Sequence, residues 1–273
     1  MKAPKFAAVL GVTLLSIYAS ATRTKTISSQ EGISNNAICS IHQNALGHLY
    51  IGTMDGLNIW DGNTLKTFVA KDGKNYFSGN QIRHIIPGKD GHLYLQTNYG
   101  TARLDMITRE VDFYDEVAFS TAIAVTKEGN IFSIGDANKL RYLDTKSSEL
   151  TTFPDIAFGE GESIKHMSLL EDGRLCIFSR KDTYLITFGD EQSPTIRKVE
   201  NTSMECLFAT PRYNGYHFVI SRDGKLFKVD GNDGKTEKIS EMESDLLRTD
   251  VVTGIIADET GCLISFMQNG VMR

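Results

Sequence analysis

The stretch Gly32–Phe68 constrains the fold of this chain more than any other feature, because it holds four short β-prone runs separated by three turn signals. The runs are rich in Ile, Tyr, Thr, Trp and Phe, which suit pleated strands. Two of the turns are Asp55-Gly56 and Asp61-Gly62, and Asp-Gly pairs tolerate the positive φ that tight hairpins require. The stretch therefore predicts a four-stranded antiparallel meander, with strands over Ala37–Gln43, His48–Thr53, Leu57–Trp60 and Leu65–Val69.

The same unit recurs along the chain, and its first turn marks each copy. Lys89-Asp90-Gly91-His92-Leu93-Tyr94 repeats Leu46-Gly47-His48-Leu49-Tyr50 almost letter for letter, and further turn glycines follow at Gly129, Gly173 and Gly215. A repeat of about 40–45 residues with four strands per unit is typical of β-propeller blades. The sequence therefore predicts an all-β protein, a β-propeller built of four-stranded antiparallel blades.

Five blades can be delimited, and a sixth begins near the end of the chain. Their expected ranges are 32–69, 79–114, 119–153, 163–199, 204–240 and, in part, 251–273. Because the sequence stops as the third strand of the sixth blade starts, we interpret the chain as a fragment of a longer propeller, or the last repeat as degenerate. A polar lead-in spans 22–31, and Thr24–Ser28 is a candidate strand that would close the ring by completing the last blade. The alternative is a frayed terminus.

The first 21 residues have the organisation of a secretory signal peptide. Lys2 and Lys5 give a positive start, Phe6–Ile17 is apolar, and Ala19-Ser20-Ala21 is a small-residue cleavage site. The apolar run is shorter than the roughly 20 residues that span a bilayer, so cleavage is favoured over a membrane anchor. The sequence therefore predicts an exported chain with no membrane span.

Composition and spacing exclude several classes of function. The net charge is −5 and no basic cluster occurs, so we expect no nucleic-acid binding. The six histidines are scattered without metal-site spacing, and no phosphate loop, nucleophile elbow or supported carboxylate pair appears, so we expect no metal, no cofactor and no catalysis. Asp230–Gly234 lacks the later acid of a calcium loop and is interpreted as a hairpin turn. The four cysteines lie far apart, which favours buried free thiols over one inter-blade disulfide.

Three segments of the first blade carry a family resemblance. Gly32-Ile33-Ser34-Asn35-Asn36 forms a lead, Gly47-His48-Leu49-Tyr50-Ile51-Gly52-Thr53 a centre, and Asp55-Gly56-Leu57-Asn58-Ile59-Trp60-Asp61-Gly62 an end. Together they resemble the two-component regulator propeller repeat, and later blades drift from it: Gly52-Thr53 becomes Gln96-Thr97 in the second blade.

This resemblance implies the periplasmic sensor region of a hybrid two-component system from polysaccharide-utilising bacteria. The family architecture adds a second propeller, an immunoglobulin-like stalk, a membrane helix, a histidine kinase, a receiver and a DNA-binding module. The expected partners are therefore downstream signalling modules or a homodimer partner. Kinase activity would need transmitter modules that these 273 residues do not contain.

A propeller binds ligands where the loops that lead into its innermost strands converge on the central channel. Those loops are rich in amide, hydroxyl and charged groups, which suit the directional hydrogen bonds of an oligosaccharide ligand. The candidate residues are Asn35, Asn36, Asn80, Gln81, Arg83, His84, Thr121, Lys165, Glu205, Arg248 and Asp250. Tyr99 is a candidate stacking face for a sugar, whereas Trp60 is expected to pack between blades. The alternative for the whole set is ordinary solvated loop polarity.

Three functions remain open at this stage. We favour a non-catalytic periplasmic sensor that binds a glycan-derived oligosaccharide. A secreted scaffold that binds another protein is the second reading. A propeller lyase or hydrolase acting on glycans is the third, and it would need a cluster of His, Tyr and Arg, or paired carboxylates, at the channel mouth.

Overall fold

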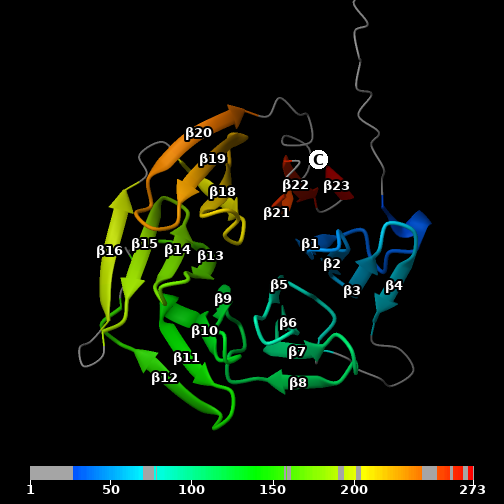
Figure 1. Ribbon diagram of the computed structural model, residues 1–273, viewed down its shortest axis with the longest axis horizontal. Helices are drawn as coiled ribbons and strands as arrows, with labels where there is room; N and C mark the ends of the chain where they lie inside the picture. The colour runs from blue at the N-terminus through cyan, green and yellow to red at the C-terminus, as the bar shows by residue number, and fades with distance from the viewer. Residues whose placement is uncertain are drawn as a thin grey trace, which may run out of the picture.

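Six antiparallel sheets surround a central channel in the computed structural model (Figure 1). The structure describes residues 27–273 except 70–76, 78, 157, 159–160, 190–193, 201–203, 242–250, 259–260, 267–269 and 273. Five sheets have four strands each in simple meander order, and the sixth has three. The prediction of an all-β propeller with five blades and a partial sixth is therefore confirmed. The expected signal peptide, 1–21, lies outside the described residues.

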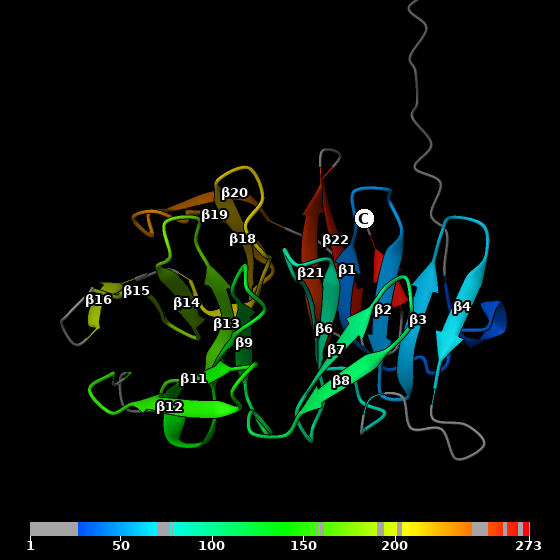
Figure 2. The same cartoon turned by 60° about the horizontal axis from the view of Figure 1, so that its bottom comes forward.

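Each blade follows chain order from the channel outward, and Figure 2 shows this order for the first blade. The first blade contains β1 (Ile38–Gln43), β2 (Leu49–Thr53), β3 (Gly56–Trp60) and β4 (Leu65–Phe68). The second contains β5 (His84–Pro87), β6 (His92–Gln96), β7 (Thr101–Asp105) and β8 (Val111–Tyr114). The third contains β9 (Ala122–Val125), β10 (Ile131–Ile134), β11 (Leu140–Asp144) and β12 (Glu149–Phe153).

The remaining sheets continue the pattern. The fourth blade contains β13 (Ile164–Leu169), β14 (Leu175–Ser179), β15 (Asp182–Thr187) and β16 (Thr195–Glu200). The fifth contains β17 (Cys206–Ala209), β18 (Tyr216–Ser221), β19 (Lys225–Asp230) and β20 (Thr236–Glu241). The sixth sheet contains β21 (Val252–Asp258), β22 (Gly261–Phe266) and β23 (Gly270–Met272), and two 3₁₀ turns, η1 (Ser29–Glu31) and η2 (Asp136–Asn138), complete the described elements.

An aspartate at the end of the third strand shapes the turn into the fourth in three successive blades. Asp61 Oδ1 accepts hydrogen bonds from the backbone N–H groups of Asn63 and Thr64, at 2.9 and 2.6 Å. Asp105 and Asp144 accept equivalent bonds from the residues two and three positions later. These bonds favour the ionised carboxylate and hold the pKa of Asp105 and Asp144 below the ordinary value. Side chains that bond their own turn explain why these positions repeat in the sequence.

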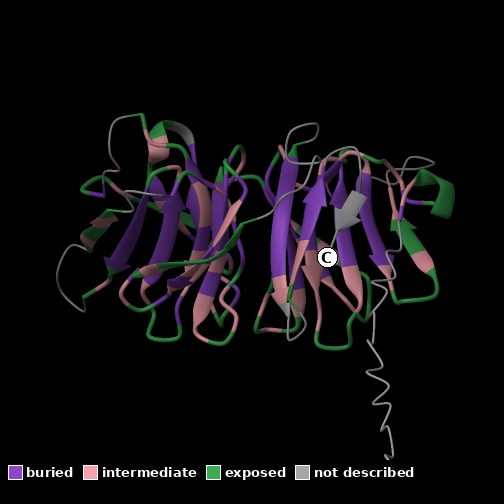
Figure 3. Ribbon diagram, turned by 90° about the horizontal axis from the view of Figure 1, so that it is seen from above, coloured by how far each residue is buried: buried purple, intermediate pink, exposed green. Residues whose placement is uncertain are grey.

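The core lies between the blades rather than in one central mass, so buried strands alternate with exposed turns around the ring (Figure 3). The sixth sheet packs against both of its neighbours. Ile256 belongs to a cluster with Ile38, Ile41 and Ile51 of the first blade, and Trp60 packs against this cluster, as expected for an inter-blade position. Val252 and Phe266 pack with Ile220 of the fifth blade. Packing of the sixth sheet therefore closes the ring.

The expected closing strand, Thr24–Ser28, falls mostly outside the described residues. Ile27 is buried against the cluster at the first blade, and Ser28 caps η1 by accepting a hydrogen bond from Gln30. Neither residue lies in a strand, so ring closure through this segment stays a prediction.

The four cysteines are free thiols, and Asp230–Gly234 forms the turn between β19 and β20. A search of the described residues finds no helix with the length and apolar character needed to cross a bilayer.

Candidate functional site

Every innermost strand carries the same four-residue pattern where it enters the channel. The first and fourth residues of the pattern are buried, whereas the second and third vary in chemistry. The pattern occupies Ile38–Ile41, Ile82–Ile85, Ser120–Ile123, Ile164–Met167, Cys206–Ala209 and Val252–Ile255. In β1, β13, β17 and β21 the register shifts at the second residue, which marks a β-bulge there. A bulge changes the direction of the side chains that follow it in the strand.

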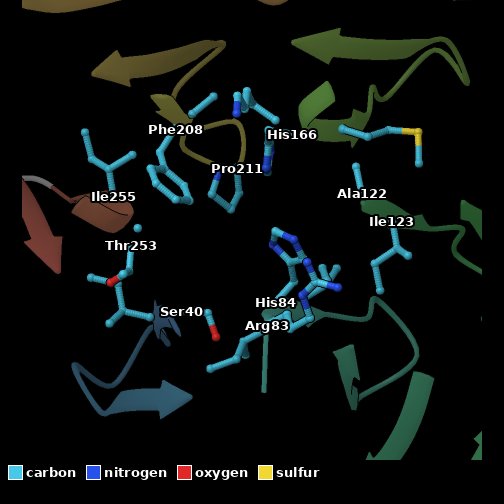
Figure 4. Close-up of a pocket in the computed structure, with 17 residues that line it drawn as sticks. Ser40, Arg83, His84, Ala122, Ile123, His166, Phe208, Pro211, Thr253 and Ile255 are labelled. Atoms are coloured by element: carbon cyan, nitrogen blue, oxygen red, sulfur yellow. The ribbon is translucent and has the colours of Figure 1, made fainter. Parts of the chain in front are cut away.

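The third and fourth residues of the pattern line a narrow cavity of about 60 Å³ inside the channel, together with three of the second residues, Arg83, Lys165 and Thr253. All six innermost strands contribute to its wall, and Figure 4 shows their side chains around the opening. The third residues of the pattern that line it are Ser40, His84, Ala122, His166, Phe208 and Gly254. A cavity of this size holds a few water molecules or one small polar group, because one water needs about 10–15 Å³ on the same measure.

Arg83 and Lys165 occupy the second position of the pattern in the second and fourth blades and also line the cavity. The backbone N–H of Arg83 bonds the carbonyl of Gln96 at 2.8 Å, which fixes its place just before β5. Among the described residues that line the cavity there is no aspartate or glutamate. The described wall of the narrow cavity therefore has two cations and no carboxylate.

His84 and His166 face each other across this cavity in Figure 4. Burial among protein atoms disfavours the charged imidazolium and lowers the pKa of His84 to about 4, and the nearby Arg83 guanidinium acts in the same direction. Burial, together with His217 and His84, lowers the pKa of His166 well below its usual value. Both rings are therefore neutral at neutral pH, and each can donate or accept a hydrogen bond.

A third histidine lies behind the channel wall. His217 Nδ1 lies 2.9 Å from the carbonyl oxygen of Thr210, and its ring centroid lies 5.0 Å from that of Phe178. The His217 side chain is fully buried, and its Nε2 has no hydrogen-bond partner among the described residues. Burial lowers the pKa of His217 to about 4, so this ring is also neutral. His166 Nε2 instead lies 2.9 Å from Ser168 Oγ.

The channel widens where the innermost strands end. A second cavity of about 560 Å³ shares Ile86, His166, Met167 and Pro211 with the narrow one, so the two adjoin. Its charged lining residues are Lys89, Arg212 and Glu171. This volume lies within the range of about 300–1,000 Å³ that is usual for small-molecule sites. The narrow cavity and the wider one together are the candidate ligand site.

Of the residues predicted from the sequence, Arg83, His84 and Lys165 line the channel. Several of the others bond neighbouring groups of their own loops or of the next blade. Asn35 accepts from Ala37 N–H, Asn36 accepts from Ser29 N–H, Asn80 donates to Asp55, Gln81 donates to Cys39 and Thr121 donates to the Ile134 carbonyl. Glu205 pairs with Arg180 at 3.7 Å and Arg222 at 3.5 Å. Arg248 and Asp250 lie outside the described residues, and Tyr99 is exposed.

The sequence analysis missed His166 as a channel residue, because it considered the scattered histidines for metal-site spacing alone and took the loops, rather than the strands, as the binding region. The sequence does contain a pattern in the innermost strands that would have identified His166. Ile82-Arg83-His84-Ile85 and Ile164-Lys165-His166-Met167 share one pattern, apolar, cationic, histidine, apolar. Aligning the repeats on these strands rather than on the turn glycines would have paired His166 with His84.

Comparison with known proteins places the fold in a broad structural class. No protein-family description matches the chain, and no curated protein matches its sequence. Solved structures match it well. The extracellular domain of BT4673, described as a hybrid two-component system from B. thetaiotaomicron, superposes with a TM-score of 0.54 at 17% identity, over 86% of this chain and 39% of that one.

Two other kinds of propeller are equally similar. Virginiamycin B lyase from Staphylococcus aureus gives a TM-score of 0.57 at 10% identity, over 87% of this chain and 94% of the lyase. PorZ, a surface component of the type-IX secretion system of Porphyromonas gingivalis, gives 0.61 at 12% identity, over 90% of this chain and 32% of PorZ. The chain thus spans less than half of the two-component domain and about a third of PorZ. At these identities the similarity shows the β-propeller fold alone.

Proposed function

We propose that this chain is the ligand-binding β-propeller of a periplasmic two-component sensor, exported by residues 1–21, which binds a glycan-derived oligosaccharide without transforming it. One observation carries the proposal. The segments Gly32–Asn36, Gly47–Thr53 and Asp55–Gly62 resemble the two-component regulator propeller repeat, and extracellular domains of two-component systems are among the proteins with the same fold.

The channel supplies the chemistry that oligosaccharide binding needs. Sugar hydroxyl groups both donate and accept hydrogen bonds, so a site for them combines fixed donors with groups of either role. Arg83 and Lys165 are donors, whereas Ser40, His84 and His166 can take either role. These five groups come from three different sheets, and Thr253 of β21 adds a fourth. Because each group is carried by a blade of the propeller, all of them are held rigidly around one opening. Signal transmission would pass to modules beyond this propeller.

The test is a thermal-unfolding screen of the full chain against neutral and acidic oligosaccharides of plant and host origin. A ligand at 100 times its Kd adds about 2.7 kcal/mol to the free energy of unfolding. For a domain of this size that raises the melting temperature by roughly 5–10 °C. We expect one glycan class to give such a shift. A cooperative melt that no glycan shifts would contradict the proposal.

Two alternatives each have a similar solved structure and one feature of this chain in their favour. A protein-binding scaffold is favoured by the likeness to PorZ and by a groove of about 590 Å³ between the third and fourth blades, lined by Phe132, Tyr142, Phe153 and Phe188. A lyase is favoured by the likeness to virginiamycin B lyase and by the neutral pair His84 and His166 in the channel. Incubation of each glycan with the chain, followed by chromatography of the products, separates binding from cleavage.

A further inference from the structure

The charge of the channel is opposite to the charge of the chain as a whole. The chain has a net charge of −5. The 17 described residues around the narrow cavity nevertheless include Arg83 and Lys165 and no acidic residue (Figure 4). The wider cavity adds Lys89 and Arg212 against one acid, Glu171. A ligand that approaches along the channel therefore meets an excess of positive charge.

Neither of the two inner cations, Arg83 and Lys165, is paired with a described acidic residue. Within the described part of the chain, none of the ion pairs involves Arg83 or Lys165. Glu205, the acid nearest in sequence to the start of β17, is engaged by Arg180 and Arg222 instead. Both cations are partly buried, and a partly buried charge without a partner costs free energy that a bound anion would offset.

The neighbouring histidines add hydrogen-bond donors to this charge. His84 and His166 follow Arg83 and Lys165 in the chain and line the same cavity. The two Arg/Lys–His pairs come from the second and fourth blades, so they line one cavity from different blades. An oxyanion there would meet charged donors and neutral imidazole N–H groups together, and charge-assisted bonds of this kind are stronger than neutral ones.

The sizes of the two cavities indicate how a ligand would be placed. The narrow cavity of about 60 Å³ has room for a carboxylate or sulfate group. The adjoining cavity of about 560 Å³ has room for sugar rings. We infer that the ligand is an anionic oligosaccharide, whose acidic group lies between Arg83 and Lys165 while its sugar rings occupy the wider cavity. This inference rests on the proposed function and narrows its ligand class.

The test compares three oligosaccharides of equal length that share galactose stereochemistry: a neutral galacto-oligosaccharide, an oligogalacturonide and a sulfated galacto-oligosaccharide. Calorimetric titration into the full chain measures Kd for each. We expect at least one acidic ligand to bind at least 10-fold more tightly than the neutral one, with affinity that falls as salt rises. The uronate and sulfate arms distinguish the two sources of negative charge.

Variants separate channel binding from general surface charge. Arg83→Gln and Lys165→Gln should each weaken binding of the acidic ligand about 10- to 100-fold. Lys66→Gln, at an exposed position of β4, the outermost strand of the first blade, is the control and should leave it unchanged. Melting of each free variant shows that it folds.

Three results would overturn the inference, and they differ. If the neutral ligand binds as tightly as the acidic ones, the anionic assignment fails while oligosaccharide sensing stands. If the acidic preference survives in both variants, the placement of the acidic group between Arg83 and Lys165 fails. If none of the three ligands binds and the wider glycan screen also gives no shift, the inference and the proposed function fail together.

Discussion

Replacing Gly52 by alanine tests how closely the first two blades pack. Gly52 lies in β2, and a Cβ built on it would lie 2.6 Å from the carbonyl oxygen of Ile82, 2.8 Å from Ile82 Cγ2, and against Ser40 Oγ. Ile82 is fully buried, and its carbonyl accepts a hydrogen bond from Ser40 Oγ at 2.9 Å. An added methyl group therefore pushes against the backbone of the next blade, which cannot rotate away.

The expected cost follows from these contacts. Over-packing costs about 1–3 kcal/mol, and a clash with backbone belongs at the upper end, so we expect a loss of about 3 kcal/mol. The melting temperature should fall by about 10 °C for a domain of this size. Urea denaturation and thermal melts of the variant and the wild type measure both quantities. A melting temperature within about 1 °C of the wild type would refute the reasoning.

A double-mutant cycle identifies the cause of that loss. Ser40→Ala removes the Oγ that the new methyl group would meet, so Gly52→Ala should cost less in that background, by about 0.5 kcal/mol or more. Gly62→Ala is the control for backbone effects. Gly62 lies in the turn between β3 and β4 at a φ of 97° with open space around its Cβ position, so its alanine variant should lose only about 1 kcal/mol, through strain.

Two further predictions concern buried polar groups. Between about pH 6.5 and pH 4 the free energy of unfolding should fall as the pH is lowered, because the pKa of His217 is about 4 in the folded state and near the ordinary value in the unfolded chain. The full loss is about 3 kcal/mol for this one ring, and there is no loss above the unfolded pKa. Urea denaturation that gave equal stability at pH 8 and pH 4.5 would contradict this prediction. Tyr94→Phe should lower the free energy of unfolding by about 1–3 kcal/mol in the same assay. The Tyr94 hydroxyl lies 2.8 Å from Asp90 Oδ2 and 3.2 Å from the Gly129 carbonyl oxygen of the next blade, and both contacts would be lost. An unchanged stability would mean that water replaces them.

The blades could be predicted from the sequence because their signals are local. Asp-Gly turns, the aspartates that bond the turn after the third strand, and β-prone runs all act within a few residues. Strands β1 to β4 accordingly lie within one residue of their predicted ends. One departure of the second blade from the repeat sequence also has a physical reason. Where the first blade has Gly52, the second has the buried Gln96, whose Nε2 donates to the Ser120 carbonyl of the third blade.

The site was harder to predict, because its residues lie far apart in the sequence and come together only when the blades are arranged in a ring. Asn35 and Asn36 suit a binding loop by composition, yet each bonds groups close to it in the chain. Lys165 and His166 lie about 80 residues from Arg83 and His84 and reach the same cavity. Turn signals determine the order of strands but not the residue of each innermost strand that faces the channel.

In the second blade, the residues that build the core and those that supply polar groups to the channel are largely distinct. Ile82 and Ile85 belong to the cluster that joins the first and second blades, although Ile85 also lines the channel. Arg83 and His84 line the channel and lie outside that cluster. A change at Arg83 or His84 should therefore alter binding without unfolding the blade. If Arg83→Gln instead lowered the melting temperature as far as Gly52→Ala does, the channel and the core would not be separable, and the channel charge would have a structural role.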